Sequence, residues 1–223
     1  MSAAYDGKVT PGGPWQTREL GELTIRKMSV SQMDNNVYLL SAPDGTQVLI
    51  DAADDVDRCM ELIDAGSGRL DAIVTTHSHW DHVRALAELV ERTGARTYAG
   101  ADDADDIPAA TDVRLTQGDR VEVGPITLAV SYLRGHTPGS VALAYTDPTD
   151  EGRVHLFTGD TLFPGGLGNT KQPGQDFDSL YADVTQRIFD VYDDRTHVYP
   201  GHGDDTDLGT ERPHLAEWRE RGW

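Results

Sequence analysis

The six residues His77-Ser78-His79-Trp80-Asp81-His82 contain four side chains that can bind a metal ion. The apolar residues 72–74 before them predict a buried strand, and the apolar spacing of residues 83–90, which stops before Gly94, predicts a helix after them. Histidines two positions apart on an extended segment point the same way, so His77 and His79 can bind one ion. Asp81 and His82 turn into the helix and can face another ion. The stretch therefore predicts a metal centre at a strand-to-helix turn.

Three later turns each place a further candidate ligand directly after a glycine. They read Gly135-His136-Thr137, Gly159-Asp160-Thr161 and Gly201-His202-Gly203. A single histidine is more often structural or solvent-facing than a ligand, but five of the eight histidines fall in these motif segments. The joint pattern favours a metal centre, whereas His155, His197 and His214 match no ligand position and are interpreted as structural.

Alternating apolar residues and turn signals predict a mixture of strands and helices. Strands are expected at residues 23–29, 37–41, 47–51, 128–132, 141–145, 154–157 and 197–199, and helices at 54–66, 177–191 and 211–221. Since both halves mix strands with helices, the predicted fold class is α/β, a sandwich in which helices cover the outer faces of two packed sheets. The glycine- and proline-rich residues 164–174 are expected to form a long loop.

Composition bounds the kind of protein. With 223 residues, 38% of them hydrophobic, the chain can bury one substantial core, and residues 1–223 are interpreted as a single domain. The only cysteine, Cys59, excludes an intrachain disulfide and a thiolate-rich metal site, and its place on an apolar helix face indicates a buried residue. No apolar run reaches the length of a membrane span and the N-terminus lacks a secretory signal, so we expect a cytoplasmic protein with no membrane partner.

The net charge of −19 also limits the partners of this chain. A surface of this sign repels phosphate backbones, so nucleic acid is not expected as a substrate. The acidic run Asp102, Asp103, Asp105 and Asp106 lacks the glycine and the closing glutamate of a calcium loop. We interpret it as a solvated loop.

The set of His-x-His-x-Asp-His followed by His136, Asp160 and His202 resembles the metallo-β-lactamase superfamily, and in particular its glyoxalase II (hydroxyacylglutathione hydrolase-like) branch. Further matching motifs are Leu49-Ile50-Asp51, Gly135-His136-Thr137-Pro138-Gly139-Ser140 and Thr158-Gly159-Asp160-Thr161-Leu162-Phe163. The resemblance runs from about residue 36 to residue 203. It implies a four-layered αβ/βα sandwich with metal ions at one edge of the two sheets.

The same resemblance implies a role for each matching residue. The first of two divalent ions would be bound by His77, His79 and His136, and the second by Asp81, His82 and His202. Asp160 would bridge the ions, and Asp51 would orient a ligand histidine by accepting its other ring N–H. Zinc is the expected metal, and iron or manganese also suit histidine and aspartate ligands. A hydroxide shared by the ions would attack the substrate carbonyl, with Asp81 as the catalytic residue that orients it or accepts its proton.

Two departures from the glyoxalase II pattern bear on the small-molecule substrate. Those enzymes carry an additional helical C-terminal domain that helps bind glutathione, and only residues 203–223 follow His202 here. Many relatives place a lysine or arginine nine residues after the bridging aspartate, where it can pair with a thiol cofactor's carboxylate, but this position is Asn169. Lys171 could supply the cation or could equally be an exposed loop lysine. The expected substrate is a thioester of a low-molecular-weight thiol, with mycothiol as one example.

Two other functions remain open at this stage. A persulfide dioxygenase keeps the same motif but uses one iron and oxygen, so metal content and oxygen uptake would separate it from a hydrolase. A non-catalytic metal-binding module would bind metal without turnover. An exported β-lactamase is disfavoured because a signal sequence is missing, and a flavodiiron oxidoreductase because His79 is not replaced by glutamate.

Overall fold

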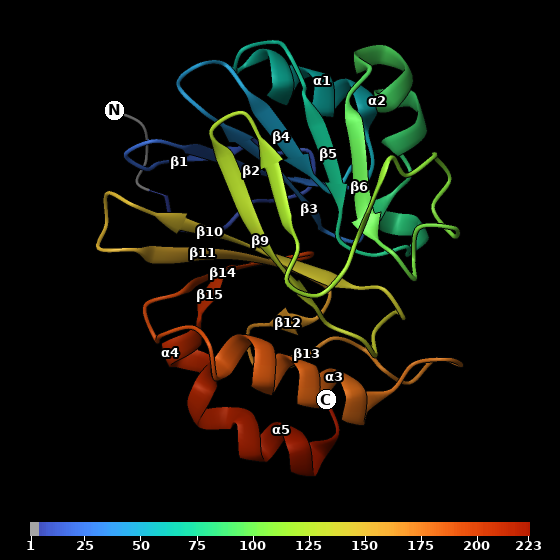
Figure 1. The fold of residues 1–223 in the computed structure, drawn as a ribbon, viewed down its shortest axis with the longest axis vertical. Helices are drawn as coiled ribbons and strands as arrows, with labels where there is room; N and C mark the ends of the chain where they lie inside the picture. The colour runs from blue at the N-terminus through green and yellow to red at the C-terminus, as the bar shows by residue number, and fades with distance from the viewer. Residues whose placement is uncertain (1–4) are drawn as a thin grey trace.

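The computed structural model describes residues 5–223 as two β-sheets packed face to face, with helices on both outer faces (Figure 1). The first sheet runs in sequence order through β1 (Gln16–Glu19), β2 (Thr24–Val30), β3 (Asn35–Ser41), β4 (Gln47–Ile50), β5 (Ala72–Thr75), β6 (Arg96–Gly100) and β7 (Val113–Leu115). The second sheet has the order β15 (Thr206–Asp207), β14 (His197–Pro200), β11 (Arg153–Gly159), β10 (Val141–Asp147), β9 (Ile126–Tyr132) and β8 (Arg120–Val123). Within residues 5–223, no helix is both long enough and apolar enough to span a bilayer.

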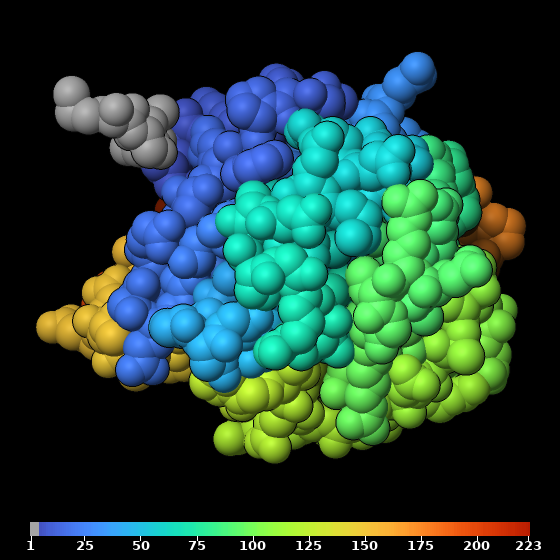
Figure 2. Space-filling model, turned by 90° about the horizontal axis from the view of Figure 1, so that it is seen from above, coloured from blue at the N-terminus to red at the C-terminus, as the bar shows by residue number. Residues whose placement is uncertain are grey.

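Helices form the two outer layers. The first sheet is covered by α1 (Val56–Asp64) and α2 (Leu86–Thr93), which lie side by side across the face shown in Figure 2. The second sheet is covered by α3 (Phe177–Val184) and α5 (Leu215–Arg221), with the short α4 (Leu208–Glu211) before α5. These layers confirm the predicted αβ/βα sandwich.

The alternation of side chains along each strand explains why the molecule has three apolar cores. Successive residues of a strand point to opposite faces, so Tyr38 and Leu40 of β3 enter the core between the sheets, while Val37 and Leu39 pack under α1 and α2. The second sheet repeats the pattern, because Phe157 of β11 faces the first sheet and its neighbour Leu156 faces α3. Strands buried on both faces require the continuous apolar runs seen in the sequence.

The candidate ligands share one edge of the two sheets. In the first sheet β4 and β5 are parallel, and in the second sheet β11 and β14 are parallel. Because parallel strands end at the same edge, Asp51, residues 76–82, Asp160 and His202 all follow strands that end there. The backbone N–H of Asn36 donates to the carbonyl of Gly201 at 2.8 Å and joins the two sheets at this edge.

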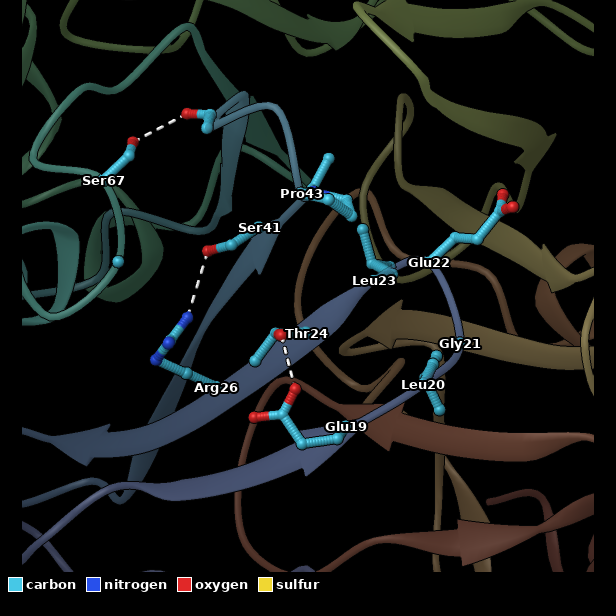
Figure 3. A pocket seen from close by; sticks show the side chains of 13 residues that line it. Glu19, Leu20, Gly21, Glu22, Leu23, Thr24, Arg26, Ser41, Pro43 and Ser67 are labelled. Carbon is cyan, nitrogen blue, oxygen red and sulfur yellow. Dashed lines mark hydrogen bonds between the residues drawn. The ribbon is translucent and has the colours of Figure 1, made fainter.

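A cavity of about 470 Å³ lies at the other end of the first sheet, where the β1–β2 and β3–β4 turns meet (Figure 3). Its polar groups pair with one another, since Thr24 donates to Glu19 at 2.7 Å and Arg26 donates to Ser41 at 3.1 Å. None of the candidate ligands lines this cavity.

Some elements differ from the prediction. The sequence does not predict the edge strands β1, β7, β8 and β15, because short strands with exposed residues such as Arg120 and Glu122 lack a clear apolar alternation. It also does not predict the inner strand β6. The helix expected over 177–191 changes after Val184 into a π-helical turn over Thr185–Phe189. The helix expected over 211–221 begins only at Leu215, because α4 ends at Glu211 and a 3₁₀ turn follows it. The expected loop 164–174 contains β13 (Gly166–Leu167), which pairs with β12 (Leu162–Phe163).

The structure confirms the predicted burial of Cys59. Its side chain is fully buried in the core under α1 and α2. Burial raises the pKa of its thiol to about 12, so the thiolate that a nucleophile requires does not form at neutral pH.

His155 of β11 is a buried residue of structural type, and it leads to a prediction about acid stability. Its Nδ1 lies 2.9 Å from the hydroxyl of Tyr199 and its Nε2 has no hydrogen-bond partner. Burial, together with the charge of Arg18, lowers the pKa of this imidazole to about 3 from its ordinary 6.5. Between these two pH values the unfolded chain binds a proton that the folded chain does not. Folding stability therefore falls as the pH falls through this window.

Replacing His155 by glutamine is expected to reduce this acid sensitivity. The slope of unfolding free energy against pH should drop by up to about 1.4 kcal/mol per pH unit below about pH 6.5, as measured by urea unfolding. The matched control is His214→Gln, because the side chain of His214 is 51% exposed and pairs only with Glu217. Equal slopes of unfolding free energy against pH for wild type and His155→Gln would contradict the low pKa assigned to His155.

Candidate metal centre

The seven predicted ligands lie together in two adjacent groups. One group is His77, His79, His136 and Asp160, and the other is Asp81, His82 and His202. Within each group the candidate ligand atoms all lie within 4.8 Å of one another. Each group takes residues from both sheets, because residues 77–82 follow β5 of the first sheet, whereas His136, Asp160 and His202 lie on loops of the second.

The local fold of residues 77–82 directs four side chains inward. His77 and His79 lie on an extended segment after β5, and Nε2 of His77 faces Nδ1 of His79 at 3.1 Å. Asp81 and His82 then lie in a 3₁₀ turn, Trp80–His82, and both are buried. The extended segment and the turn therefore present separate pairs of ligands, as the spacing predicted.

Hydrogen bonds assign the tautomers of the first group. The Thr76 hydroxyl donates to Asp51 at 2.8 Å, so at 3.0 Å it accepts from Nδ1–H of His77, and Nε2 of His77 carries a lone pair. His136 donates from Nδ1–H to the carbonyl of Asn169 at 2.7 Å. Its Nε2 is buried and has no hydrogen-bond partner among residues 5–223. A buried acceptor of this kind, close to the rings of His77 and His79, suits a metal ligand.

The second group shows the same feature. His82 donates from Nδ1–H to Asp51 at 3.0 Å, and His202 donates from Nδ1–H to the carbonyl of Met33 at 2.8 Å. Nε2 is therefore the ring atom of each histidine that is left to bind a cation, and the two Nε2 atoms face each other at 3.2 Å. Two lone pairs at this distance repel unless a positive charge lies beside them. The donor set of nitrogen and carboxylate oxygen suits a divalent transition metal.

Asp160 lies between the two groups. Its Oδ2 is 3.7 Å from Nε2 of His136 and 3.3 Å from Nε2 of His202, and its Oδ1 is 3.3 Å from Nε2 of His82. Oδ1 is buried without a hydrogen-bond partner. A carboxylate in this place can contact an ion in each group, which is the arrangement expected of a bridging ligand.

The charges of the centre favour the binding of cations. Burial opposes charge on His82 and His202, but the carboxylates around them outweigh burial and raise the pKa of His82 well above its usual range and that of His202 to about 10. Burial lowers the pKa of His77 and of His136, so these imidazoles are neutral. Burial also opposes ionisation of Asp160, but His82 and His202 hold its pKa well below its usual range. His77 and His136 are thus neutral, whereas the carboxylates favour positive charge at His82 and His202, a charge that a bound cation would supply in place of a proton.

Asp51 orients two histidines. Its Oδ2 accepts from His82 directly and reaches His77 through the hydroxyl of Thr76. It also has a positive φ of 58°, a conformation that costs a non-glycine residue on the order of 1 kcal/mol. The structure therefore places Asp51 where a residue that fixes ligand orientation is expected.

Two residues of the centre were missed from the sequence. Asn35 donates from its side chain to Oδ2 of Asp81 at 3.0 Å and is fully buried. Asp103 was assigned to a solvated loop, and this is wrong because its side chain is fully buried and contacts the turns around both His77 and His136. Its neighbours Asp102, Asp105 and Asp106 are exposed, as predicted. The sequence pattern that predicts burial is an apolar alternation, and neither Asn35 nor Asp103 belongs to one.

The two predicted substrate-binding residues lie on the loop beside His136. The backbone carbonyl of Asn169 holds the His136 ring, and the side chain of Asn169 accepts from the backbone N–H of Lys171 at 3.1 Å. Lys171 is exposed. Both are therefore close in sequence and space to a candidate ligand, and their contact with substrate stays a prediction.

Comparisons with known proteins agree with this geometry. Residues 31–203 match the profile described as Metallo-beta-lactamase superfamily. A hydroxyacylglutathione hydrolase from Thermosynechococcus vestitus is 40% identical over 151 residues, which cover 66% of this chain and 57% of that protein. The crystal structure of ETHE1 from Myxococcus xanthus matches with a TM-score of 0.77 and 29% identity, over 88% of this chain and 84% of that one. The crystal structure of TTHA1623 in a di-iron-bound form matches with a TM-score of 0.69 and 33% identity, over 82% and 95% of the two chains.

Proposed function

Since the chain belongs to the metallo-beta-lactamase superfamily, we propose that it is a hydrolase that uses two divalent metal ions to cleave a thioester of a low-molecular-weight thiol. One observation carries the proposal: the Nε2 atoms of His77, His82, His136 and His202 all lie within 4 Å of the carboxylate of Asp160. Neutral imidazoles around a shared carboxylate are a donor set for zinc, iron or manganese. We propose zinc as the metal.

The choice of a thioester is supported by the similarity to a hydroxyacylglutathione hydrolase. The matched region covers little more than half of that protein's length, so its thiol is not carried over to this chain together with the reaction. We propose that Lys171 pairs with a carboxylate of the thiol, because it is exposed on the loop that holds His136. A cytoplasmic location and the lack of nucleic-acid partners stay predictions.

Divalent ions in this centre would make water a nucleophile at neutral pH and would polarise a carbonyl oxygen of the substrate. The protein's own residues fix the geometry. The side-chain amide of Asn35 donates to Oδ2 of Asp81 at 3.0 Å and holds this carboxylate in one orientation. That contact supports an orienting role for Asp81 over a role as general base.

A persulfide dioxygenase is the second candidate. It is supported by the structural similarity to ETHE1 over 88% of this chain. In that case one iron would use the first group, and Asp81 and His202 would not be ligands. The similarity to TTHA1623 in a di-iron-bound form supports an occupied second group instead.

One purified sample can decide between the two candidates. Metal content is measured by elemental analysis, and the same sample is assayed for hydrolysis of acyl thioesters of glutathione and mycothiol and for persulfide-dependent oxygen uptake. About two ions per chain with hydrolysis that a chelator abolishes is the expected result. One iron per chain with oxygen uptake would contradict the hydrolase and support the dioxygenase. Bound metal without either activity would contradict both and leave a non-catalytic binding module.

A further inference from the structure

Asp103 is a fully buried carboxylate just beyond the end of β6. Its Oδ2 accepts from the backbone N–H of Ser78 at 2.8 Å and from the hydroxyl of Thr137 at 2.7 Å. Its Oδ1 accepts from the backbone N–H of Gly139 at 2.6 Å. Ser78 lies between His77 and His79, and Thr137 directly follows His136. One side chain therefore contacts both turns that carry the three histidines of the first group.

The backbone around Asp103 is shaped for this contact. A Cβ on Gly139 would lie 2.4 Å from the backbone nitrogen of Asp103 and 2.8 Å from its Oδ1. A Cβ on Gly100 would lie 1.9 Å from the carbonyl oxygen of Gly139. Two glycines thus let the turn after β6, in the first sheet, approach the β9–β10 loop of the second sheet. The close approach places Asp103 between elements that share no strand pairing.

Burying a carboxylate is unfavourable by several kcal/mol unless hydrogen bonds compensate it. The three donors compensate that cost, and an apolar residue of the same size would leave all three without an acceptor. The two oxygens of Asp103 accept from all three donors in a fixed arrangement. A neutral or positively charged side chain of this size does not offer two acceptor oxygens. The second group is held by other contacts, namely Asp51, Asn35 and the carbonyl of Met33.

We propose that Asp103 is a positioning residue that sets the spacing between the His77–His79 segment and His136, and so controls metal affinity at the first group alone. The inference rests on the proposed metal centre. It assigns a function to a residue that contacts no candidate ligand side chain, and it predicts that the two ions respond differently to one substitution.

Asp103→Asn is the informative variant. An asparagine amide has one acceptor oxygen and one NH₂ group, so in either orientation the NH₂ group faces a backbone N–H, of Ser78 or of Gly139. The turns then separate while the volume of the side chain stays the same. Asp106→Asn is the matched control, because Asp106 lies in the same turn, is exposed and undergoes the same change of charge.

The experiment measures Zn²⁺ affinity of the metal-stripped full chain by chelator competition in two backgrounds. His202→Ala leaves the first group complete, and His79→Ala leaves the second group complete. Asp103→Asn is expected to weaken Zn²⁺ binding by about 10- to 100-fold in the His202→Ala background, the usual effect of losing a residue that orients ligands. It should leave the affinity in the His79→Ala background unchanged. Asp106→Asn should have no effect in either background.

Three results would overturn the inference. Unchanged affinity in the His202→Ala background would show that Asp103 does not position the ligands. Equal losses in both backgrounds would show a general structural role. If Asp103→Asn does not fold, Thr137→Val serves as the second variant, because it removes one of the three hydrogen bonds. It should weaken Zn²⁺ binding at the first group only, and Thr137→Ser should restore the affinity. No loss of affinity with Thr137→Val would also contradict the inference. A wild-type chain that binds no Zn²⁺ would contradict the proposed function itself, which these variants do not test.

Discussion

Asp160→Asn is expected to lower the rate of thioester hydrolysis by at least about 10³-fold, at the upper end of the effect of removing one preorganised electrostatic group from an active site. Among residues 5–223, Asp160 is the only carboxylate within 4 Å of imidazoles of both groups, which include His77, His82 and His202. An amide keeps the shape but removes the negative charge that two cations would share. Steady-state kinetics and elemental analysis of the same preparation measure the effect, and metal content should fall below about two ions per chain.

The matched control is Asp178→Asn, which changes the same charge at an exposed position of α3. Its activity and metal content should equal those of the wild type. Unchanged hydrolysis by Asp160→Asn would mean that the reaction does not depend on a shared ligand, and the two-ion proposal would be wrong.

Gly201→Ala is expected to disrupt the centre through a single methyl group. A Cβ at this position would lie 2.2 Å from Oδ1 of Asp160 and 2.9 Å from Cε1 of His82. Contacts this short force one of the two side chains to move, and both are candidate ligands. We expect hydrolysis to fall by about 10²-fold or more and the free energy of unfolding to fall by about 1–3 kcal/mol, the usual cost of overpacking. Kinetics, metal analysis and urea unfolding test these effects.

Gly203→Ala is the control that distinguishes a steric clash with the candidate ligands from a change in the conformation of the loop. Gly203 lies two residues away with open space around its Cα, but its φ of +68° makes alanine strained. The control should therefore lose about 1 kcal/mol of stability and retain its metal. If both variants lose metal equally, the loop conformation and not the methyl contact is responsible.

The candidate ligands could be singled out from the sequence because their pattern is local. Residues 77–82 carry four candidate ligands in one turn, and His136, Asp160 and His202 each follow a glycine at the end of a strand or in a tight loop. Strands whose two faces are both buried, such as β3 and β10, also carry long apolar runs that predict them well. Their order and the helices between them fix the layered architecture.

Other features depend on tertiary contacts that no local pattern contains. Asp103 has the same neighbours in sequence as the exposed Asp102, and only the approach of the β9–β10 loop buries it. Asn35 becomes part of the centre because β3 begins beside His202, with which it forms an isolated β-bridge. Edge strands such as β8 form because they pair with a neighbouring strand, and their own composition does not predict them.

Each ion would take ligands from both sheets, and this has a consequence for folding. The unfolded chain cannot bring His77 and His136, or His82 and His202, to one ion without also bringing the sheets together. Metal binding therefore belongs to the folded state, and by mass action it stabilises that state by about 4 kcal/mol when free metal exceeds the dissociation constant a thousandfold. The same ions that would act on substrate would join the two halves of the sandwich, so the supply of metal in the cell would set the lifetime of the protein as well as its activity.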